Sequence, residues 1–271
     1  MSPVPTLAVV NHKGGTGKTT TAVSLAAALG ELGYRVLMVD LDPQASATRW
    51  LGPDGGGGDF GDRPYRVLEG TLPAAEAVVA TRHGVGLLPA NATLRQAERV
   101  LAGEPGSDAA LRATLRGLPE GAYDAVVVDS PPHEGFLSAN ALLAATGLVV
   151  PVETRILALE GLASMIAKIR RLGARLEREL PIAAILACRL DRRTAHAPWV
   201  AESIRGFFAE EFPGVPCLEI RENVALSDAA AAREPITTFR PRATGAEDYR
   251  AVARVVGRGL GALRGGGRHR G

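Results

Sequence analysis

The chain carries a glycine- and lysine-rich loop between an apolar segment and an alanine-rich segment, close to its N-terminus. The apolar segment Leu7–Val10 predicts a strand, and Lys18–Leu32 predicts a helix. Glycines let successive backbone N–H groups turn toward an anion, and a helix N-terminus adds positive potential. This order of elements predicts a phosphate-binding loop. Its expected contacts are Lys13, Gly14, Gly15, Thr16, Gly17, Lys18, Thr19 and Thr20.

The lysines support this interpretation. The chain has three lysines and 28 arginines, and two of the three lysines are Lys13 and Lys18. An ammonium is a compact point charge, whereas a guanidinium is a planar fork, so the two serve different chemistry. In a nucleotide-binding loop, the lysine at position 18 reaches the β- and γ-phosphates, and the Thr19 hydroxyl ligates Mg²⁺. A turn without nucleotide needs neither lysine.

Apolar and amphipathic segments alternate along the rest of the chain. Several apolar segments are continuous, as is typical of strands buried on both faces of a parallel sheet. Further strands are expected at Val36–Val39, Val85–Leu88, Ala125–Val128, Leu148–Val152, Ile182–Ala187 and Val215–Ile220. Further helices are expected at Leu94–Leu101, Asp108–Leu118, Leu137–Ala145, Leu159–Glu179, Trp199–Glu210 and Ala246–Leu263. The pattern predicts an α/β fold, a doubly wound, mostly parallel sheet with helices on both faces, in one domain at residues 1–264.

Composition excludes several classes of protein. Of 271 residues, 46% are hydrophobic and 22% are charged, with a net charge of +2, which excludes a disordered chain. No apolar run reaches the roughly 18 to 20 residues that cross a bilayer, and residues 1–5 lack a secretory leader. Cys188 and Cys217 offer neither a disulfide framework nor a four-thiolate metal site. We expect a cytoplasmic protein.

Two glycine-rich segments interrupt this pattern. Gly52–Pro64 contains four consecutive glycines and predicts a surface loop. The sequence of residues 265–271, GGGRHRG, predicts a disordered basic tail.

Three aspartates end predicted strands. Asp40 and Asp42 follow the strand at Val36–Val39, and residues two apart on an extended chain share a face. Asp129 follows the buried run at Ala125–Val128. Open α/β sheets bind ligands at the carboxyl ends of their strands, so we expect these carboxylates near the phosphates. The alternative is that they are solvated strand ends or caps.

Longer motifs extend the similarity to a known family. The loop departs from the common GxxxxGK[ST] pattern because position 12 is His12. The segments NHKGGTGKTTTAVSLAAAL, RVLMVDLDPQASAT and VVVDSPP resemble the ParA/Soj family of chromosome- and plasmid-partitioning ATPases, which carry the deviant Walker A form of the P-loop. The resemblance runs from about Leu7 to Val256. It includes ALEGL at 158–162, ENVALSDA at 222–229 and GAEDY at 245–249.

The resemblance implies ATP and Mg²⁺ as ligands and gives roles to the aspartates. It implies that Asp42 orients and polarises the attacking water. It places Asp40 near the metal through water. Asp129, in a Walker B pattern, should hold the water shell of the metal. Slow, partner-stimulated ATP hydrolysis is the implied activity.

The resemblance also implies an ATP-dependent homodimer. Lys13 corresponds to a lysine that crosses the dimer interface to the phosphates of the partner, where it neutralises transferring charge as an arginine finger does. Asn223 is a candidate contact to the adenine, and the alternative for this residue is an Asx-type turn. Glu153 and Arg155 depart from the Q-x-E that relatives carry at this place.

Partners follow from the same resemblance. Family members bind double-stranded DNA without sequence preference and are stimulated by a ParB-like centromere-binding protein, which implies a nucleoid-associated protein. Arg193 matches a family arginine implicated in DNA binding, and Arg221 is a second candidate because Ala225 stands where relatives have another. The alternative is a MinD-like or cargo-positioning ATPase acting on a membrane or a protein scaffold. The glycine-rich C-terminus lacks the amphipathic helix that membrane binding needs, so no membrane partner is expected.

Overall fold

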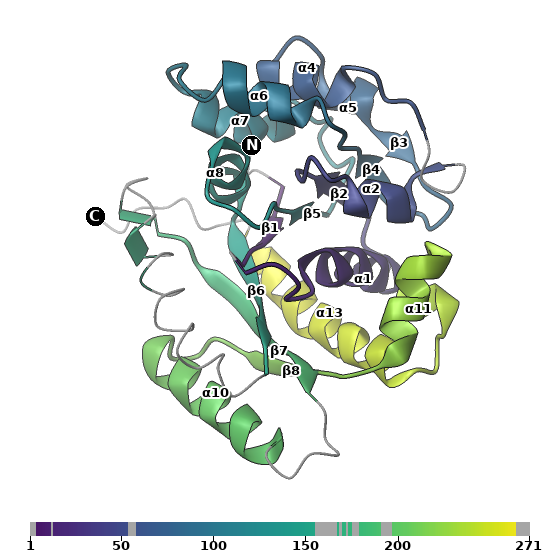
Figure 1. Ribbon diagram of the computed structural model, residues 1–271, viewed down its shortest axis with the longest axis vertical. Helices are drawn as coiled ribbons and strands as arrows, with labels where there is room; N and C mark the ends of the chain where they lie inside the picture. Colours follow the sequence, from purple (N-terminus) through teal and green to yellow (C-terminus); the bar gives the residue numbers. More distant parts are fainter. Residues whose placement is uncertain are drawn as a thin grey trace.

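The computed structural model describes residues 4–11, 13–53, 58–154, 167, 170–171, 173–174, 179–190 and 197–263. These residues form an eight-stranded sheet in the order β3-β4-β2-β5-β1-β6-β7-β8 (Figure 1). Every neighbouring pair is parallel except β3 and β4. The strands are β1 (Thr6–Val9), β2 (Val36–Asp40), β3 (Val79–Ala80), β4 (Gly86–Leu88), β5 (Ala125–Asp129), β6 (Gly147–Glu153), β7 (Ile182–Leu190) and β8 (Cys217–Arg221). The predicted α/β fold with a mostly parallel sheet is confirmed.

Helices cover both faces of this sheet. On one face lie α1 (Lys18–Glu31), α2 (Ser46–Leu51), α11 (Val224–Ala232), α12 (Ile236–Phe239) and α13 (Thr244–Leu263). On the other lie α4 (Arg63–Glu69), α5 (Ala74–Ala77), α6 (Leu94–Val100), α7 (Ala110–Arg116), α8 (Phe136–Ala144) and α10 (Ala197–Glu211). Figure 1 shows α1, α11 and α13 grouped on one side and α6, α7 and α8 on the other.

The continuous apolar strands explain this double covering. In β1, Leu7 and Val9 pack into the core beneath α1 and α13, whereas Ala8 packs into the core beneath α8. Successive side chains of a strand point to opposite faces, so a strand with both faces buried must be apolar throughout. All five residues of β5 are buried, including its terminal aspartate Asp129.

Short elements and element ends differ from the sequence prediction. The helices α2, α4, α5, α11 and α12 and the antiparallel strand β3, which have two to nine residues each, were not predicted. The expected helix Asp108–Leu118 is a 3₁₀ turn, Ser107–Ala109, followed by α7. β7 continues three residues past Ala187, to Leu190.

The predicted surface loop at Gly52–Pro64 is only partly a loop. Phe60 is buried in it, and Arg63 and Pro64 already belong to α4. A proline in the first turn suits a helix because its missing N–H has no partner there in any case. Residues 54–57, most of the predicted helix Leu159–Glu179 and the tail at 265–271 lie outside the described residues.

Within the described part of the chain, no helix combines the length and the apolar character needed to cross a membrane.

Candidate phosphate and metal site

The glycine-rich loop follows β1 and leads directly into α1. Gly15 and Gly17 adopt φ values of 78° and 89°, the left-handed region that favours glycine. A Cβ atom added at Gly14, Gly15 or Gly17 would meet no described atom within 4 Å, so the loop faces open space. No described side chain caps the start of α1, and its first turn contains no acidic residue. Backbone N–H groups and the positive end of the helix are therefore available to an anion.

Asn11 fixes the loop to the neighbouring strand. Its Nδ2 donates to the carbonyl of Pro151 at 2.7 Å, and its Oδ1 accepts from the amide of Lys13 at 2.9 Å. The Lys13 carbonyl in turn accepts from the Thr16 hydroxyl at 3.3 Å. Asn11 was not among the predicted site residues, although it is a polar residue directly after the predicted strand Leu7–Val10.

Lys18 begins α1, and its side chain turns back over the loop. The residue is only 8% exposed, and its Nζ donates to the carbonyl of Lys13 at 3.2 Å. Burial lowers the pKa of Lys18, and the nearby carboxylates of Asp129 and Asp42 oppose that shift. A buried ammonium that donates to a neutral carbonyl is stabilised further when it pairs with an anion such as a phosphate.

Asp40 and Asp129 lie side by side because β2 and β5 pair in register at these two residues. Both are 1% exposed. Asp40 is well supplied with donors: Oδ2 accepts from the amide and the hydroxyl of Thr48, both at 2.8 Å, and Oδ1 accepts from the amide of Asp42 at 3.0 Å. Burial nevertheless raises the pKa of Asp40 to about 6. Thr48 also accepts from the amide of Ala90 at 2.8 Å, so Asp40 holds together three segments beyond the strand ends.

Asp129 is the unsatisfied member of the pair. Neither of its buried carboxylate oxygens has a hydrogen-bond partner among the described residues. Burial, followed by the charge of Asp40, raises the pKa of Asp129 well above its usual range, and the side chains of Thr19 and Lys18 offset only part of this effect. Buried carboxylates are normally hydrogen-bonded or bound to a cation, so this one requires an explanation.

These residues fit a hard divalent cation. Asp129 and Thr19 offer a carboxylate and a hydroxyl oxygen, the ligand types that Mg²⁺ prefers, directly or through its waters. Among the described residues, no cluster of three acidic, histidine or cysteine side chains could hold a metal by itself. Such a cation must therefore take its remaining ligands from water or from bound phosphate. Asp40 already accepts three hydrogen bonds, which leaves it little capacity to bind a cation directly, and its role near the metal through water stays a prediction.

Asp42 begins the turn between β2 and α2. Its Oδ1 accepts from the amide of Gln44 at 2.8 Å, and its carbonyl accepts from the amide of Ala45 at 2.7 Å. Ala45 closes this turn at φ 55°, a left-handed conformation that costs a non-glycine residue about 1 to 2 kcal/mol. Asp42 Oδ2 accepts no hydrogen bond from the described residues, so it is available to a water molecule.

Lys13 lies at the outer side of the loop. Its Nζ is 3.3 Å from Oε2 of Glu153, and Arg189 Nη1 is 3.2 Å from the other oxygen of the same carboxylate. The Lys13 side chain is 63% exposed, whereas that of Glu153 is 9% exposed. The sequence singled out Glu153 as a departure from the family pattern but did not predict its pairing with Lys13.

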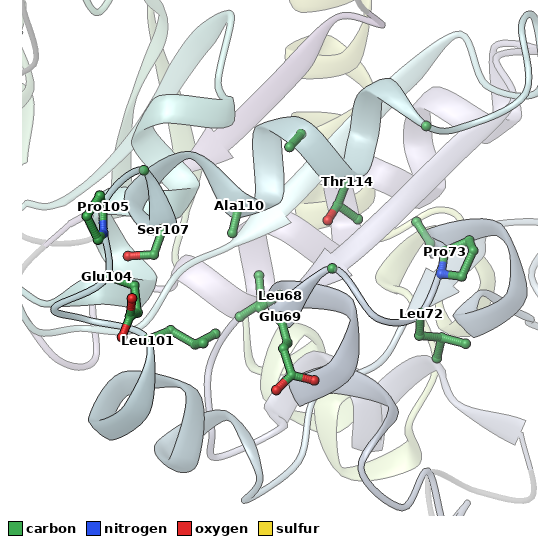
Figure 2. Close-up of a pocket in the computed structure, with 15 residues that line it drawn as sticks. Leu68, Glu69, Leu72, Pro73, Leu101, Glu104, Pro105, Ser107, Ala110 and Thr114 are labelled. Carbon is green, nitrogen blue, oxygen red and sulfur yellow. The ribbon is translucent and has the colours of Figure 1, made fainter.

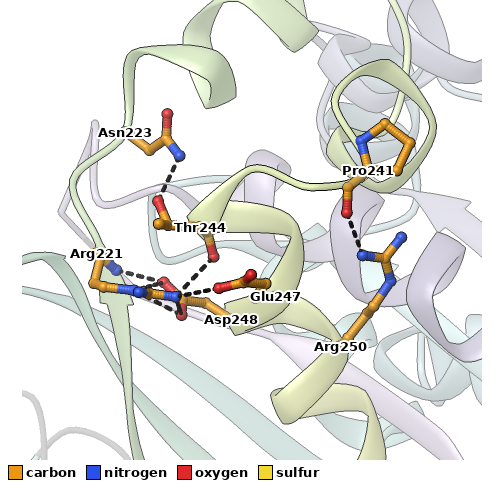
Figure 3. A network of polar contacts seen from close by, with 7 residues as sticks. All are labelled: Arg221, Asn223, Pro241, Thr244, Glu247, Asp248 and Arg250. Carbon is orange, nitrogen blue, oxygen red and sulfur yellow. Dashed lines mark hydrogen bonds and ion pairs between the residues drawn. The ribbon is translucent and has the colours of Figure 1, made fainter.

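The two predicted residues at the end of β8 are held within the chain itself (Figure 3). Arg221 Nη2 is 2.6 Å from Oδ1 of Asp248 and 3.1 Å from Oε2 of Glu247, and these carboxylates raise the pKa of the guanidinium. Asn223 caps α11 by accepting from the amide of Ala225 at 2.9 Å and donates to the Thr244 hydroxyl at 2.7 Å.

These contacts hold β8, α11 and α13 together, and they bear on the predicted adenine contact of Asn223 and the predicted DNA contact of Arg221. The turn role that the sequence left open for Asn223 is the one in which it is found, and its contact to adenine stays a prediction. The guanidinium of Arg221 is largely neutralised, which weighs against a DNA contact there. Tyr249, which follows Asp248 in the segment GAEDY, shares a hydrogen bond of 3.1 Å with the Thr21 hydroxyl, so this segment also contacts the helix that follows the loop. Arg193 lies outside the described residues, as do His12 and Arg155.

A separate cavity of about 590 Å³ lies among α4, α6 and α7 (Figure 2). Apolar side chains such as Leu68 and Leu101 line it together with Glu69 and Glu104. None of the predicted nucleotide-site residues lines this cavity, so it is distinct from the loop.

Asp129→Asn should stabilise the ligand-free protein. A raised pKa means that the folded state favours the protonated carboxyl, so its contribution to stability is present at low pH and lost as the pH rises through the raised value. At about pH 8 the variant should gain about 1 to 2 kcal/mol in free energy of unfolding, and at about pH 5 the gain should shrink. Urea denaturation at both values measures this, with the exposed Asp62→Asn as control. A destabilised variant at the higher pH would contradict the assignment of an uncompensated buried charge.

Comparisons with known proteins agree with this geometry. Residues 4–182 match the family model described as an AAA domain. The chain is 42% identical over 250 residues to the chromosome-partitioning ATPase Soj of Thermus thermophilus, covering 92% of this chain and 94% of that protein. It is 35% identical to the sporulation initiation inhibitor protein Soj of Bacillus subtilis, covering 92% and 97%.

A solved structure is also similar over nearly the whole chain. The cobyrinic acid a,c-diamide synthase of Mycobacterium smegmatis, determined with bound ADP and magnesium, superimposes with a TM-score of 0.78 at 32% identity, and 96% of each chain is covered. The matching fold, the deviant phosphate loop and the relatives named above lead to one assignment. The chain belongs to the ParA/Soj family of partitioning ATPases.

Proposed function

We propose that this protein is a Mg-ATP-dependent partitioning ATPase whose γ-phosphate controls assembly of a homodimer. The observation that carries the proposal is the buried, unpartnered carboxylate of Asp129 beside Thr19 and Lys18, next to a loop of available backbone N–H groups. The Soj relative is named as a chromosome-partitioning ATPase, and the comparison structure holds ADP and magnesium. Both agree with this choice of ligands.

The chemistry assigns a separate task to each residue. The backbone N–H groups of Gly14, Gly15 and Gly17 and the start of α1 bind the phosphates. Lys18 moves from the Lys13 carbonyl to the terminal phosphates. Thr19 and Asp129 hold the metal, which when bound neutralises the charge that develops during phosphoryl transfer. Asp42 orients the attacking water through Oδ2.

The same site explains a nucleotide-dependent dimer. Lys13 is exposed at the edge of the loop, where its ammonium can reach the phosphates of a second subunit. Two subunits facing each other enclose two nucleotides, and loss of the γ-phosphate removes an anionic partner of each lysine. We propose slow turnover that a ParB-like protein stimulates.

DNA is the surface on which this dimer acts in our proposal. Net charge of +2 gives one subunit little long-range attraction to DNA, so a local patch must supply the affinity. Since Arg221 is engaged by carboxylates, we place the main contact at Arg193. Binding without sequence preference would associate the protein with the nucleoid in the cytoplasm.

Substitutions in the loop and in the turn should separate binding from turnover. Lys18→Ala should reduce affinity for a fluorescent ATP analogue by at least about 100-fold, because it removes the buried charge that pairs with the terminal phosphates. Asp42→Ala should bind the analogue as the wild type does but lose phosphate release. Exposed Asp62→Asn serves as the control and should change neither quantity. Normal turnover in Asp42→Ala would contradict the role of that carboxylate.

The ATP state should be dimeric and should bind DNA. Asp42→Ala protein with ATP should scatter light as a dimer and shift unrelated duplexes alike, whereas ADP should give a monomer with weak binding. Because dimerisation doubles the phosphate contacts, the salt slope should steepen by about −0.9 for each added contact. Arg193→Ala should flatten that slope without changing ATP affinity, while Arg116→Ala, on the exposed side of α7, should not. An ATP dimer that ignores DNA at low salt would favour the membrane or protein-scaffold alternative.

A further inference from the structure

The carboxylate of Glu153 binds two cations at the edge of the phosphate loop. Oε2 is 3.3 Å from Lys13 Nζ, and Oε1 is 3.2 Å from Arg189 Nη1. Glu153 ends β6, which pairs with β1 on one side and with β7 on the other. Its carboxylate therefore contacts one cation from the loop that follows β1 and one from β7.

Lys13 is anchored at its backbone and held lightly at its tip. Its amide and carbonyl are engaged by Asn11, Thr16 and Lys18, so the main chain is fixed. The side chain is 63% exposed, and among the described residues its ammonium contacts Glu153. An ion pair with one solvated partner is weak, so a more highly charged anion can take the ammonium from it.

We propose that Glu153 is a positioning residue that retains Lys13 within its own subunit until the phosphates of a partner subunit compete for it. This inference rests on the proposed function, because it assumes that Lys13 acts across the dimer. Glu153 thereby raises the Kd of the ATP-bound dimer. Arg189 weakens this effect on the dimer Kd, because it contacts the same carboxylate and reduces the negative charge that attracts Lys13.

If Glu153 retains Lys13, two substitutions should change the dimer Kd in opposite directions. Glu153→Gln keeps the shape and loses the charge, so the dimer should dissociate less. One half-exposed ion pair changes an equilibrium constant by a factor of about two to five. Each dimer that forms breaks two such pairs, one in each subunit, so loss of the pairs should lower the dimer Kd about 4- to 25-fold. Arg189→Asn should raise this Kd, because the carboxylate that Lys13 faces then has one cation fewer beside it. Asparagine tolerates the left-handed φ of 59° at this position.

The measurement is light scattering against protein concentration at saturating non-hydrolysable ATP analogue. Glu219→Gln is the matched control, because it makes the same chemical change at another ion pair, 2.6 Å from Arg205 Nη1. It should leave the dimer Kd unchanged. A dimer that is weakened or unaffected by Glu153→Gln would overturn the proposal. A wild type that never dimerises would instead contradict the proposed function.

A second measurement tests the retention in the monomer, without nucleotide. Because the chain has three lysines, the acetylation rate of Lys13 can be followed by peptide mass spectrometry, with Lys18 and Lys168 as internal references. Glu153→Gln should increase the rate at Lys13 severalfold relative to Lys168. Circular dichroism checks that the variants are folded. An unchanged rate in a folded variant would show that Glu153 does not retain the lysine.

Discussion

Two carboxylates, Asp40 and Asp129, end neighbouring strands of a parallel sheet, and each is 1% exposed. Burial raises the pKa of both groups, and the charge of Asp40 adds to the shift at Asp129. Among the described residues, Asp40 accepts three hydrogen bonds and Asp129 has no hydrogen-bond partner, so the less compensated charge falls on Asp129. Lys18 is the buried cation nearby, and its own burial opposes its charge. In our proposal, a divalent cation compensates the charge of the carboxylates, and a polyphosphate compensates the charge of Lys18.

Lys13 connects this balance to assembly. Its carbonyl accepts the Lys18 ammonium, and its own ammonium contacts Glu153. In our proposal, Lys18 moves to a phosphate and the Lys13 carbonyl keeps only the Thr16 hydroxyl of its two described side-chain donors. The γ-phosphate of the facing subunit then draws the Lys13 ammonium away from Glu153. Nucleotide binding would then change the contacts of the Lys13 carbonyl, and dimerisation would change those of its ammonium. Lys13 would in this way couple the two steps.

The sequence predicts the parts of this arrangement that depend on local pattern. Both faces of β1 and β5 are buried, so their apolar runs were recognisable, and the loop between β1 and α1 has few alternatives once its glycines and lysines are read in order. Pairings set by register were not predictable in this way. Glu153 meets Lys13 across 140 positions, and Arg221 meets Asp248 across 27, so both contacts depend on which strands lie side by side. The same reason explains why Asn11 was missed.

Proton release on nucleotide binding tests the central claim most directly, because the claim concerns the charge of the buried carboxylates. Because the pKa of both groups is raised, the ligand-free pair binds protons more readily than ordinary carboxylates do, and a bound cation should displace protons from it. Calorimetric titration with magnesium and a non-hydrolysable ATP analogue, at about pH 7 in two buffers of different ionisation heat, counts these protons. We predict net proton release from the wild type and clearly less release from Asp129→Asn. Equal heats in both buffers for the wild type would contradict the account.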